Sequence, residues 1–146
     1  MIFSKSFGYS VRAMLYIALK NDLNNRISVE EIANALTVPK YFLSKVMKKL
    51  DKAGVLNSAK GIHGGFEINR RTLDTTLLEI VQITDGADKL ETCALGLRKC
   101  DSRNPCPLHS HFALIKNEWH MKLSGYTIGS LLETKNKDFI KSISVL

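Results

Sequence analysis

The sequence has no long apolar run. No stretch approaches the roughly 18 to 20 apolar residues that a membrane-spanning helix needs, and residues 1–5 lack the apolar run of a signal peptide. Of the 146 residues, 45% are hydrophobic and 24% are charged, which suits a single folded unit with one core. We therefore expect a cytoplasmic protein that has no membrane partner.

The sequence also lacks the short motifs that mark common enzyme sites. It contains no phosphate-binding glycine loop and no HExxH pair for zinc. No acid and base are paired beside its cysteines. An iron-sulfur electron carrier or a zinc hydrolase is therefore a poor interpretation, and we expect no enzymatic activity.

Acidic residues are scarce in the first half of the chain. Residues 1–71 contain 12 Lys or Arg but only 5 Asp or Glu, whereas residues 72–146 contain 9 of each kind. The formal net charge of +7 therefore comes entirely from the first half. A localised basic excess binds phosphates and releases their counterions, which favours nucleic acid as the partner.

The basic half carries the pattern of a helix-turn-helix. Apolar residues at helical spacing predict a first helix over residues 9–20. Ser28 followed by Glu31 has the spacing of a capping box and predicts a short second helix that ends before Pro39. Pro39 then begins a third helix, which stops before Gly54.

This third helix is predicted to have an apolar face and a basic face. The apolar face has the spacing i, i+3, i+4 and i+7 and consists of Leu43, Val46, Met47 and Leu50. The opposite face could enter the major groove of double-stranded DNA and consists of Lys40, Tyr41, Ser44, Lys45 and Lys48. On this pattern alone, lysines that merely solvate a surface helix are the alternative.

A glycine-tipped β-hairpin is expected directly after this helix. Alternating apolar residues follow the segment 61–65, which contains three glycines. A hairpin in this place is a wing, whose tip approaches the phosphate backbone or the minor groove. The wing residues expected at DNA are Lys60, His63 and Gly64, with Arg70 and Arg71 on the flank. The predicted fold class is therefore mainly α, a winged helix-turn-helix.

The second half is predicted to hold a loop and a long dimerisation helix. A short amphipathic helix over residues 77–84 precedes a loop that runs to about Pro107. An apolar stripe then follows, which could pack on the core or on a twin helix, and we favour a homodimer: Leu108, Phe112, Ile115, Trp119 and Leu123. A two-fold dimer would read an inverted repeat. We expect a DNA-binding domain over residues 1–84, and the loop, helix and tail over residues 85–146.

The chain has only three cysteines, and all of them lie in this loop. Six residues separate Cys93 from Cys100, five separate Cys100 from Cys106, and His109 follows after two more. An odd number of cysteines is a poor disulfide framework, and no CxxC pair is present to clamp zinc. Widely spaced thiolates favour an iron-sulfur cluster, with zinc or three plain thiols as the alternatives.

An iron-sulfur cluster needs a fourth ligand beside three cysteines. His109 is the nearest candidate, while His111 and His120 lie on the same segment and a residue of a second subunit is a further alternative. Three basic residues of the loop could partly offset the negative charge of thiolates and sulfides: Arg98, Lys99 and Arg103.

The order of these features is similar to that of one known family. The segment 9–18, the helix-turn-helix, the wing glycines Gly64 and Gly65 before an aromatic residue, the cysteine loop and the long helix resemble the IscR/NsrR/CymR family of bacterial winged-helix regulators, the Rrf family. The resemblance implies a homodimer on a palindromic operator, which we expect to act as a repressor. It also implies that the three cysteines hold a cluster that senses iron-sulfur status, nitric oxide or redox state. Cys106 and His109 match the Cys-x-x-His of IscR-like members.

The chain departs from the family pattern at a few positions. His63 stands where the wing tip often has arginine, and Gly8 stands where NsrR-like members supply an acidic cluster ligand. The first cysteine interval is one residue longer than in IscR-like members, so a 2Fe-2S and a 4Fe-4S cluster both fit the pattern. We expect the state of the cluster to reshape the loop and shift the dimer helix. The alternative is a cluster-free regulator, CymR-like, controlled by a protein partner or by thiol oxidation.

Overall fold

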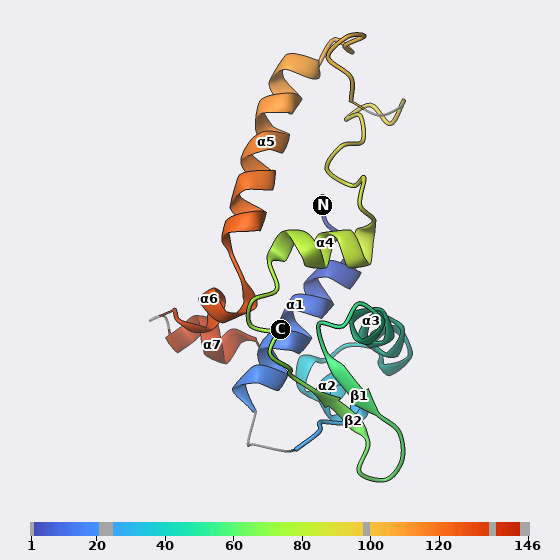
Figure 1. Cartoon of the computed structure of the whole chain (residues 1–146), viewed down its shortest axis with the longest axis vertical. Helices are drawn as coiled ribbons and strands as arrows, with labels where there is room; N and C mark the ends of the chain where they lie inside the picture. Colours follow the sequence, from blue (N-terminus) through green and yellow to red (C-terminus); the bar gives the residue numbers. More distant parts are fainter. Residues whose placement is uncertain (1, 21–24, 98–99, 135–136, 144–146) are drawn as a thin grey trace.

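Figure 1 shows a largely helical chain with one small hairpin. The structure is a computed structural model, which describes residues 2–20, 25–97, 100–134 and 137–143. In chain order its elements are α1 (Lys5–Leu19), α2 (Val29–Leu36), α3 (Lys40–Lys52), β1 (Asn57–Ala59), β2 (Gly65–Glu67), α4 (Leu77–Asp85), α5 (His109–Gly125), α6 (Ile128–Leu132) and α7 (Lys137–Ser142). Within these ranges, no helix is long and apolar enough to cross a membrane.

α1 is the helix around which the core is built. The Ser4 side chain accepts a hydrogen bond from the Phe7 backbone N–H at 3.2 Å, so the helix begins at Lys5 and not at residue 9 as predicted. Its inner face, which includes the fully buried Ala13 and Met14, packs against α2, α3, α4 and α6. The recognition elements and the second half of the chain therefore share one apolar core.

α2 and α3 form the predicted helix-turn-helix. Ser28 caps α2 by accepting from the Glu31 N–H at 3.1 Å, but the Glu31 side chain turns to Tyr16 and Lys20, so only half of the capping box forms. Thr37, with φ of 55°, turns the chain between the two helices. The predicted inner face of α3 is buried as expected: Leu43, Val46, Met47 and Leu50.

β1 and β2 pair antiparallel, with Asn57 opposite Glu67 and Ala59 opposite Gly65. The segment before α2 extends this pairing, because the Ile27 and Phe66 backbones exchange hydrogen bonds of 2.8 and 2.9 Å. A Cβ on Gly65 would lie 2.4 Å from the Ile27 carbonyl oxygen, so this position requires glycine. The hairpin is thereby fastened to the start of the helix-turn-helix.

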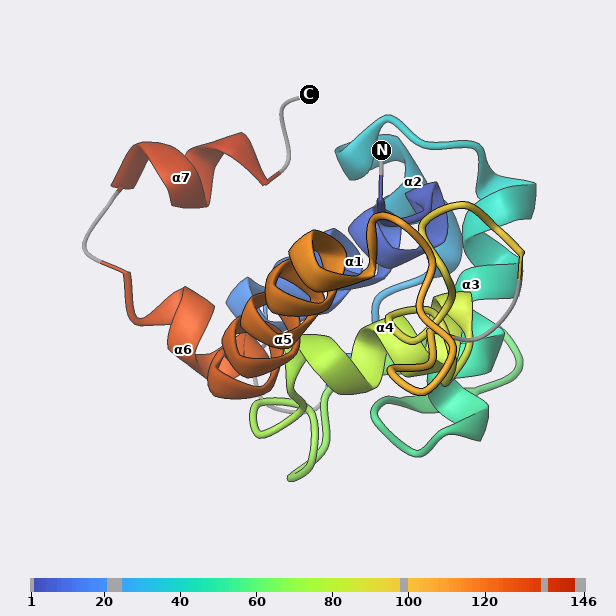
Figure 2. The ribbon, with the colours of Figure 1, turned by 90° about the horizontal axis from the view of Figure 1, so that it is seen from above.

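The second half begins on α4 and extends away from the hairpin. α5 and the loop that precedes it project beyond α4, while the hairpin lies at the opposite end of the molecule (Figure 1). Figure 2, a view from above, shows α5 crossing over α1 and α4. α4 therefore lies between the cysteine loop and the helix-turn-helix.

The tail, which the sequence left without a predicted structure, forms α6 and α7. Ile128 and Ile143 are buried in the core, and the Ile128 backbone N–H donates to the Thr75 carbonyl at 3.0 Å. α5 is therefore not the last helix of the chain. The division into residues 1–84 and 85–146 stays a prediction, although α6 packs on α1 across it.

Asp85 ties the last turn of α4 to the start of α1. Its carboxylate accepts hydrogen bonds from the Ser4 backbone N–H at 2.9 Å, from the Ser4 hydroxyl and from the Thr84 hydroxyl at 2.8 Å. Burial disfavours the charged form, but the hydrogen bonds from Ser4 outweigh this effect and hold the pKa of Asp85 below its usual range. The ionised carboxylate therefore stabilises the fold.

We expect Asp85→Asn to lower the free energy of unfolding at neutral pH by about 1–2 kcal/mol, because a charge-assisted contact is lost. Since the folded-state pKa is depressed, the wild type holds this stability in full above the unfolded-state pKa of about 4. It loses the stability as the pH falls through the folded-state pKa. Urea unfolding at several pH values measures this difference, and the exposed Asp88→Asn is the matched control. An equal loss of unfolding free energy in Asp85→Asn and Asp88→Asn would contradict the stabilising role of the Asp85 carboxylate.

Candidate functional site

α3 presents its predicted basic face to the outside. All the residues expected there are exposed or half-buried: Lys40, Tyr41, Ser44, Lys45 and Lys48. The Lys45 ammonium lies 4.4 Å from the centre of the Tyr41 ring, a cation–π contact that leaves both groups on the surface. Lys40 Nζ lies 3.3 Å from Glu30 Oε2 of α2. Because this pair is exposed and screened by solvent, the Lys40 charge stays available to a stronger anionic partner.

The wing tip carries the other predicted contacts. Lys60 and His63 are exposed, as expected. A Cβ on Gly64 would lie 2.4 Å from the Ala59 carbonyl oxygen, so Gly64 shapes the turn, and its contact with DNA stays a prediction. Ile62 is 98% exposed at the same tip. It was not predicted from the sequence as a contact residue, although a large apolar side chain between the glycines of a hairpin tip indicates an exposed position.

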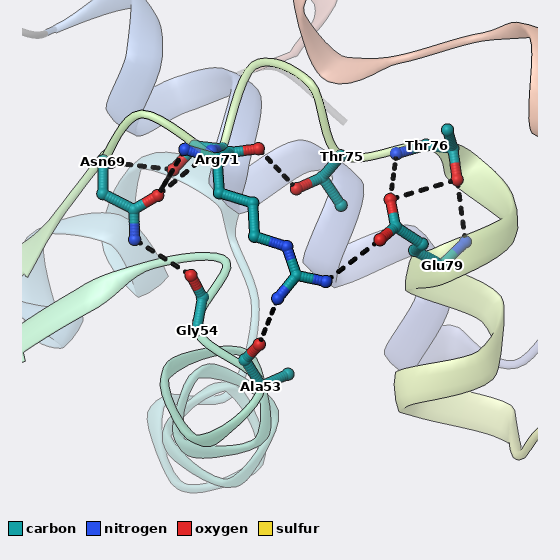
Figure 3. Close-up of polar contacts among 8 residues, drawn as sticks. Ala53, Gly54, Asn69, Arg71, Thr75, Thr76 and Glu79 are labelled. Carbon is teal, nitrogen blue, oxygen red and sulfur yellow. Dashed lines mark hydrogen bonds and ion pairs between the residues drawn. The ribbon is translucent and has the colours of Figure 1, made fainter.

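Arg71, expected on the flank of the wing, makes two contacts within the protein while its side chain stays 54% exposed. Figure 3 shows its guanidinium between the end of α3 and the first turn of α4. One nitrogen donates to the Ala53 carbonyl at 2.9 Å, and the other donates to the Glu79 carboxylate at 3.0 Å. The exposed Arg70 beside it stays a candidate for phosphate contact.

The structure brings the four predicted cysteine-site residues together. Cys93 is buried, while Cys100, Cys106 and His109 are half-buried. All four line one cavity of about 110 Å³ between the loop and the start of α5. Cys100 Sγ lies 3.2 Å from His109 Nδ1. His111 and His120 are exposed on α5 and do not line this cavity.

Local turns of the loop position the thiols. The Gly96 N–H donates to the Cys93 carbonyl at 2.8 Å, with Gly96 at a φ of 70°. The Cys100 N–H donates to the Glu91 carbonyl at 2.9 Å, which folds the middle of the loop back on its start. The His109 N–H donates to the Cys106 carbonyl at 2.9 Å as α5 begins. Backbone contacts, and not a disulfide, therefore set the path, since all three cysteines are free thiols.

The surroundings of Cys93 lower the pKa of its thiol. Hydrogen bonding from the Leu95 backbone lowers the pKa of the Cys93 thiol, and the Cys106 side chain and the Lys116 charge lower it further. Lys116 of α5 also donates to the Thr92 carbonyl. Lys116 adds a positive charge that the sequence did not predict here. Of the three loop residues expected to supply charge, Arg103 pairs with Asp101 at 3.5 Å, and Arg98 and Lys99 lie outside the described residues.

The chemistry of the donor set fits an iron-sulfur cluster. Three soft thiols and one imidazole line a shared cavity, and thiolates and imidazole are the side chains that hold such clusters.

A helix-turn-helix with a basic outer helix and a wing defines a winged-helix DNA-binding protein. The sequence model of Rrf2, described as an iron-dependent transcriptional regulator, matches residues 3–134. The chain belongs to the Rrf2 family of transcriptional regulators. Its members are regulators, which confirms that the chain is not an enzyme.

Relatives and solved structures agree with this family. A protein of Aquifex aeolicus, named as a candidate HTH-type transcriptional regulator, is 36% identical over 139 residues and spans 94% of this chain and 95% of its own. The NsrR regulator of Shouchella clausii is 32% identical over 122 residues, 81% of this chain and 74% of its own.

Two solved structures confirm the winged-helix fold class. Staphylococcus aureus CymR in an oxidised form superposes with a TM-score of 0.73 at 18% identity, covering 94% of this chain and 100% of its own. IscR of T. potens superposes with a TM-score of 0.67 at 21% identity, covering 89% of this chain and 85% of its own. At these identities the likeness concerns the fold alone.

Proposed function

We propose that this chain is a homodimeric repressor whose affinity for a palindromic operator is set by an iron-sulfur cluster on Cys93, Cys100, Cys106 and His109. The observation that carries the proposal is the single cavity that these four side chains line, in a loop between α4 and α5. The iron-dependent description of the family supports it. When bound, such a cluster would supply iron that changes oxidation state and is removable by oxidants or nitric oxide.

α5 supports the dimer. Trp119 and Leu123 of its predicted stripe serve the monomer, since Trp119 lies 4.7 Å from the Phe3 ring, centre to centre, and Leu123 is buried. Three other residues of the stripe, Leu108, Phe112 and Ile115, stay exposed on one face of the projecting helix, while Leu114 and Met121 are exposed on another side. The exposed part of the stripe fits a matching helix of a second copy.

The cysteine loop is well placed to influence DNA binding. It leaves the last turn of α4 at Gly86 and enters α5 at His109. α4 in turn packs against α1, α3 and α5. A different path of the loop would therefore shift the helix that supports α3 and the helix that supports the dimer.

We expect Lys48→Ala to weaken operator binding about five- to tenfold near 0.1 M salt and to lower the salt slope by about one, because one phosphate contact is removed. The probe is a duplex selected from a random-sequence pool by the wild-type protein, titrated by fluorescence anisotropy at several salt concentrations. The exposed Lys141→Ala on α7 is the charge-matched control. If Lys48→Ala binds the duplex as tightly as the wild type, α3 is not part of the DNA-binding surface.

A cluster-free regulator controlled by thiol oxidation is the second candidate. Cys106 lies within hydrogen-bonding reach of Cys93, so a peroxide could take two electrons and two protons from this pair and leave a disulfide and water. Such a protein would be colourless after anaerobic purification, whereas a cluster protein absorbs visible light. An anaerobic absorption spectrum separates the two.

A further inference from the structure

The three residues directly after the recognition helix are held by the segment that follows the wing. Ala53, Gly54 and Val55 satisfy carbonyls of the last turn of α3, because their backbone N–H groups donate to Lys49, Asp51 and Leu50. Three side chains in turn bind the carbonyls of these residues: Arg71 donates to Ala53 at 2.9 Å, Asn69 to Gly54 at 3.0 Å and Thr72 to Val55 at 2.7 Å. The orientation of α3 therefore depends on residues outside the helix-turn-helix.

Arg71 is the member of this group that also reaches α4. Its second nitrogen donates to Glu79 Oε1 at 3.0 Å. The other carboxylate oxygen of Glu79 accepts from the Thr76 backbone N–H at 2.9 Å, in a complete capping box at the start of α4. The Thr76 backbone hydrogen bond lowers the pKa of Glu79, so the carboxylate is charged when it holds Arg71. One planar guanidinium thus joins the end of α3 to the beginning of α4 (Figure 3).

We propose that Arg71 is a positioning residue that clamps the recognition helix to α4 and does not contact phosphate. Through this clamp, the position of α4 sets the angle at which α3 meets the groove. α4 leads at its other end into the cysteine loop, so the clamp is also the route by which the loop acts on α3; this second part rests on the proposed function. The support for the clamp is the position of the guanidinium, which spans the Ala53 carbonyl and the Glu79 carboxylate although the side chain is 54% exposed.

Three variants separate a clamp from a phosphate contact. Arg71→Lys keeps the charge but cannot bridge both acceptors, so we expect it to bind the selected duplex about three- to tenfold more weakly, like Arg71→Gln. The salt slope of both variants should equal that of the wild type, because no phosphate contact is lost. Glu79→Gln should also weaken binding, although it removes a negative charge. Arg70→Gln, at the exposed neighbouring position, is the control for charge.

The opposite pattern would overturn the clamp. If Arg71 contacts phosphate, Arg71→Lys binds like the wild type, Arg71→Gln lowers the salt slope by about one, and Glu79→Gln binds more tightly. Urea unfolding shows that each variant is folded at the assay temperature. Lys48→Ala, run beside them, separates the two proposals: weak binding by this variant together with normal binding by Arg71→Gln overturns the clamp alone.

The second part of the proposal has its own readout. The ratio of operator affinities between iron-loaded and iron-free protein should shrink at least about threefold in Arg71→Gln, since the loop loses its route to α3. An unchanged ratio would overturn this route. A wild type whose affinity is the same in both states would instead contradict the proposed function, while the salt slopes still decide whether Arg71 is a clamp.

Discussion

Cys100→Ala is expected to lose nearly all bound iron and sulfide and to make operator affinity independent of iron loading. Cys100 contributes one of three thiols to the cavity and lies 3.2 Å from His109 Nδ1, so its loss leaves two thiols and an imidazole without its partner. Two cysteines and one histidine are one ligand short of the four that usually hold a cluster. Iron and sulfide analysis, with an anaerobic absorption spectrum between roughly 320 and 460 nm, measures the loss.

A histidine pair supplies the control for this variant. His109→Ala should bind iron and sulfide less stably than the wild type, whereas the exposed His111→Ala should match it. Iron content that stays at the wild-type level in Cys100→Ala would contradict the assignment of this thiol. If His109→Ala and His111→Ala bind iron and sulfide equally well, His109 is not a ligand of the cluster.

Gly65→Ala is expected to destabilise the protein by about 2–4 kcal/mol and to abolish the wing contribution to DNA binding. Its Cβ would lie 2.4 Å from the Ile27 carbonyl oxygen, at a φ of 145° that alanine rarely adopts. Relief of this clash would separate β2 from the segment before α2, where Ile27 and Phe66 pair. Urea unfolding and duplex titration measure the two effects.

Two other glycines separate the clash from backbone strain. Gly61 has a φ of 100° but open space around it, so Gly61→Ala should cost only about 1 kcal/mol. Gly8 lies in α1 with open space and ordinary dihedrals, so Gly8→Ala should stabilise the helix by about 0.5–1 kcal/mol. A loss in Gly65→Ala no larger than in Gly61→Ala would contradict the close contact with Ile27.

The sequence predicts the elements whose signals are local. The apolar period of α3, Pro39 before it and the glycines after it were sufficient to predict the helix and the wing. α6 was not predictable in this way, because it has five residues and its anchor, Ile128, pairs with the Thr75 backbone. Short helices that are stabilised by distant partners leave little periodicity to read.

In the candidate site, too, residues with a local sequence pattern were predictable, and residues brought in by distant elements were not. The cysteine spacing and His109 predicted four side chains that the fold does bring to one cavity. Lys116 was not predictable as their neighbour, because α5 places it there from a distant part of the chain. The role of Arg71 was hidden for a similar reason, since the sequence shows a basic residue near a wing but not the Ala53 carbonyl beside it. Thr76 and Glu79, in contrast, have the readable spacing of a capping box.

Control of operator affinity by an iron-sulfur cluster is tested by one titration performed on one preparation in two states. The wild-type protein is purified without oxygen, and its affinity for the selected duplex is measured by fluorescence anisotropy before and after the iron is removed with a chelator. We expect iron, sulfide and visible absorption in the first state, and a change in affinity of about tenfold or more between the states, the size of a typical allosteric coupling. A colourless preparation, or equal affinities with and without iron, would contradict it.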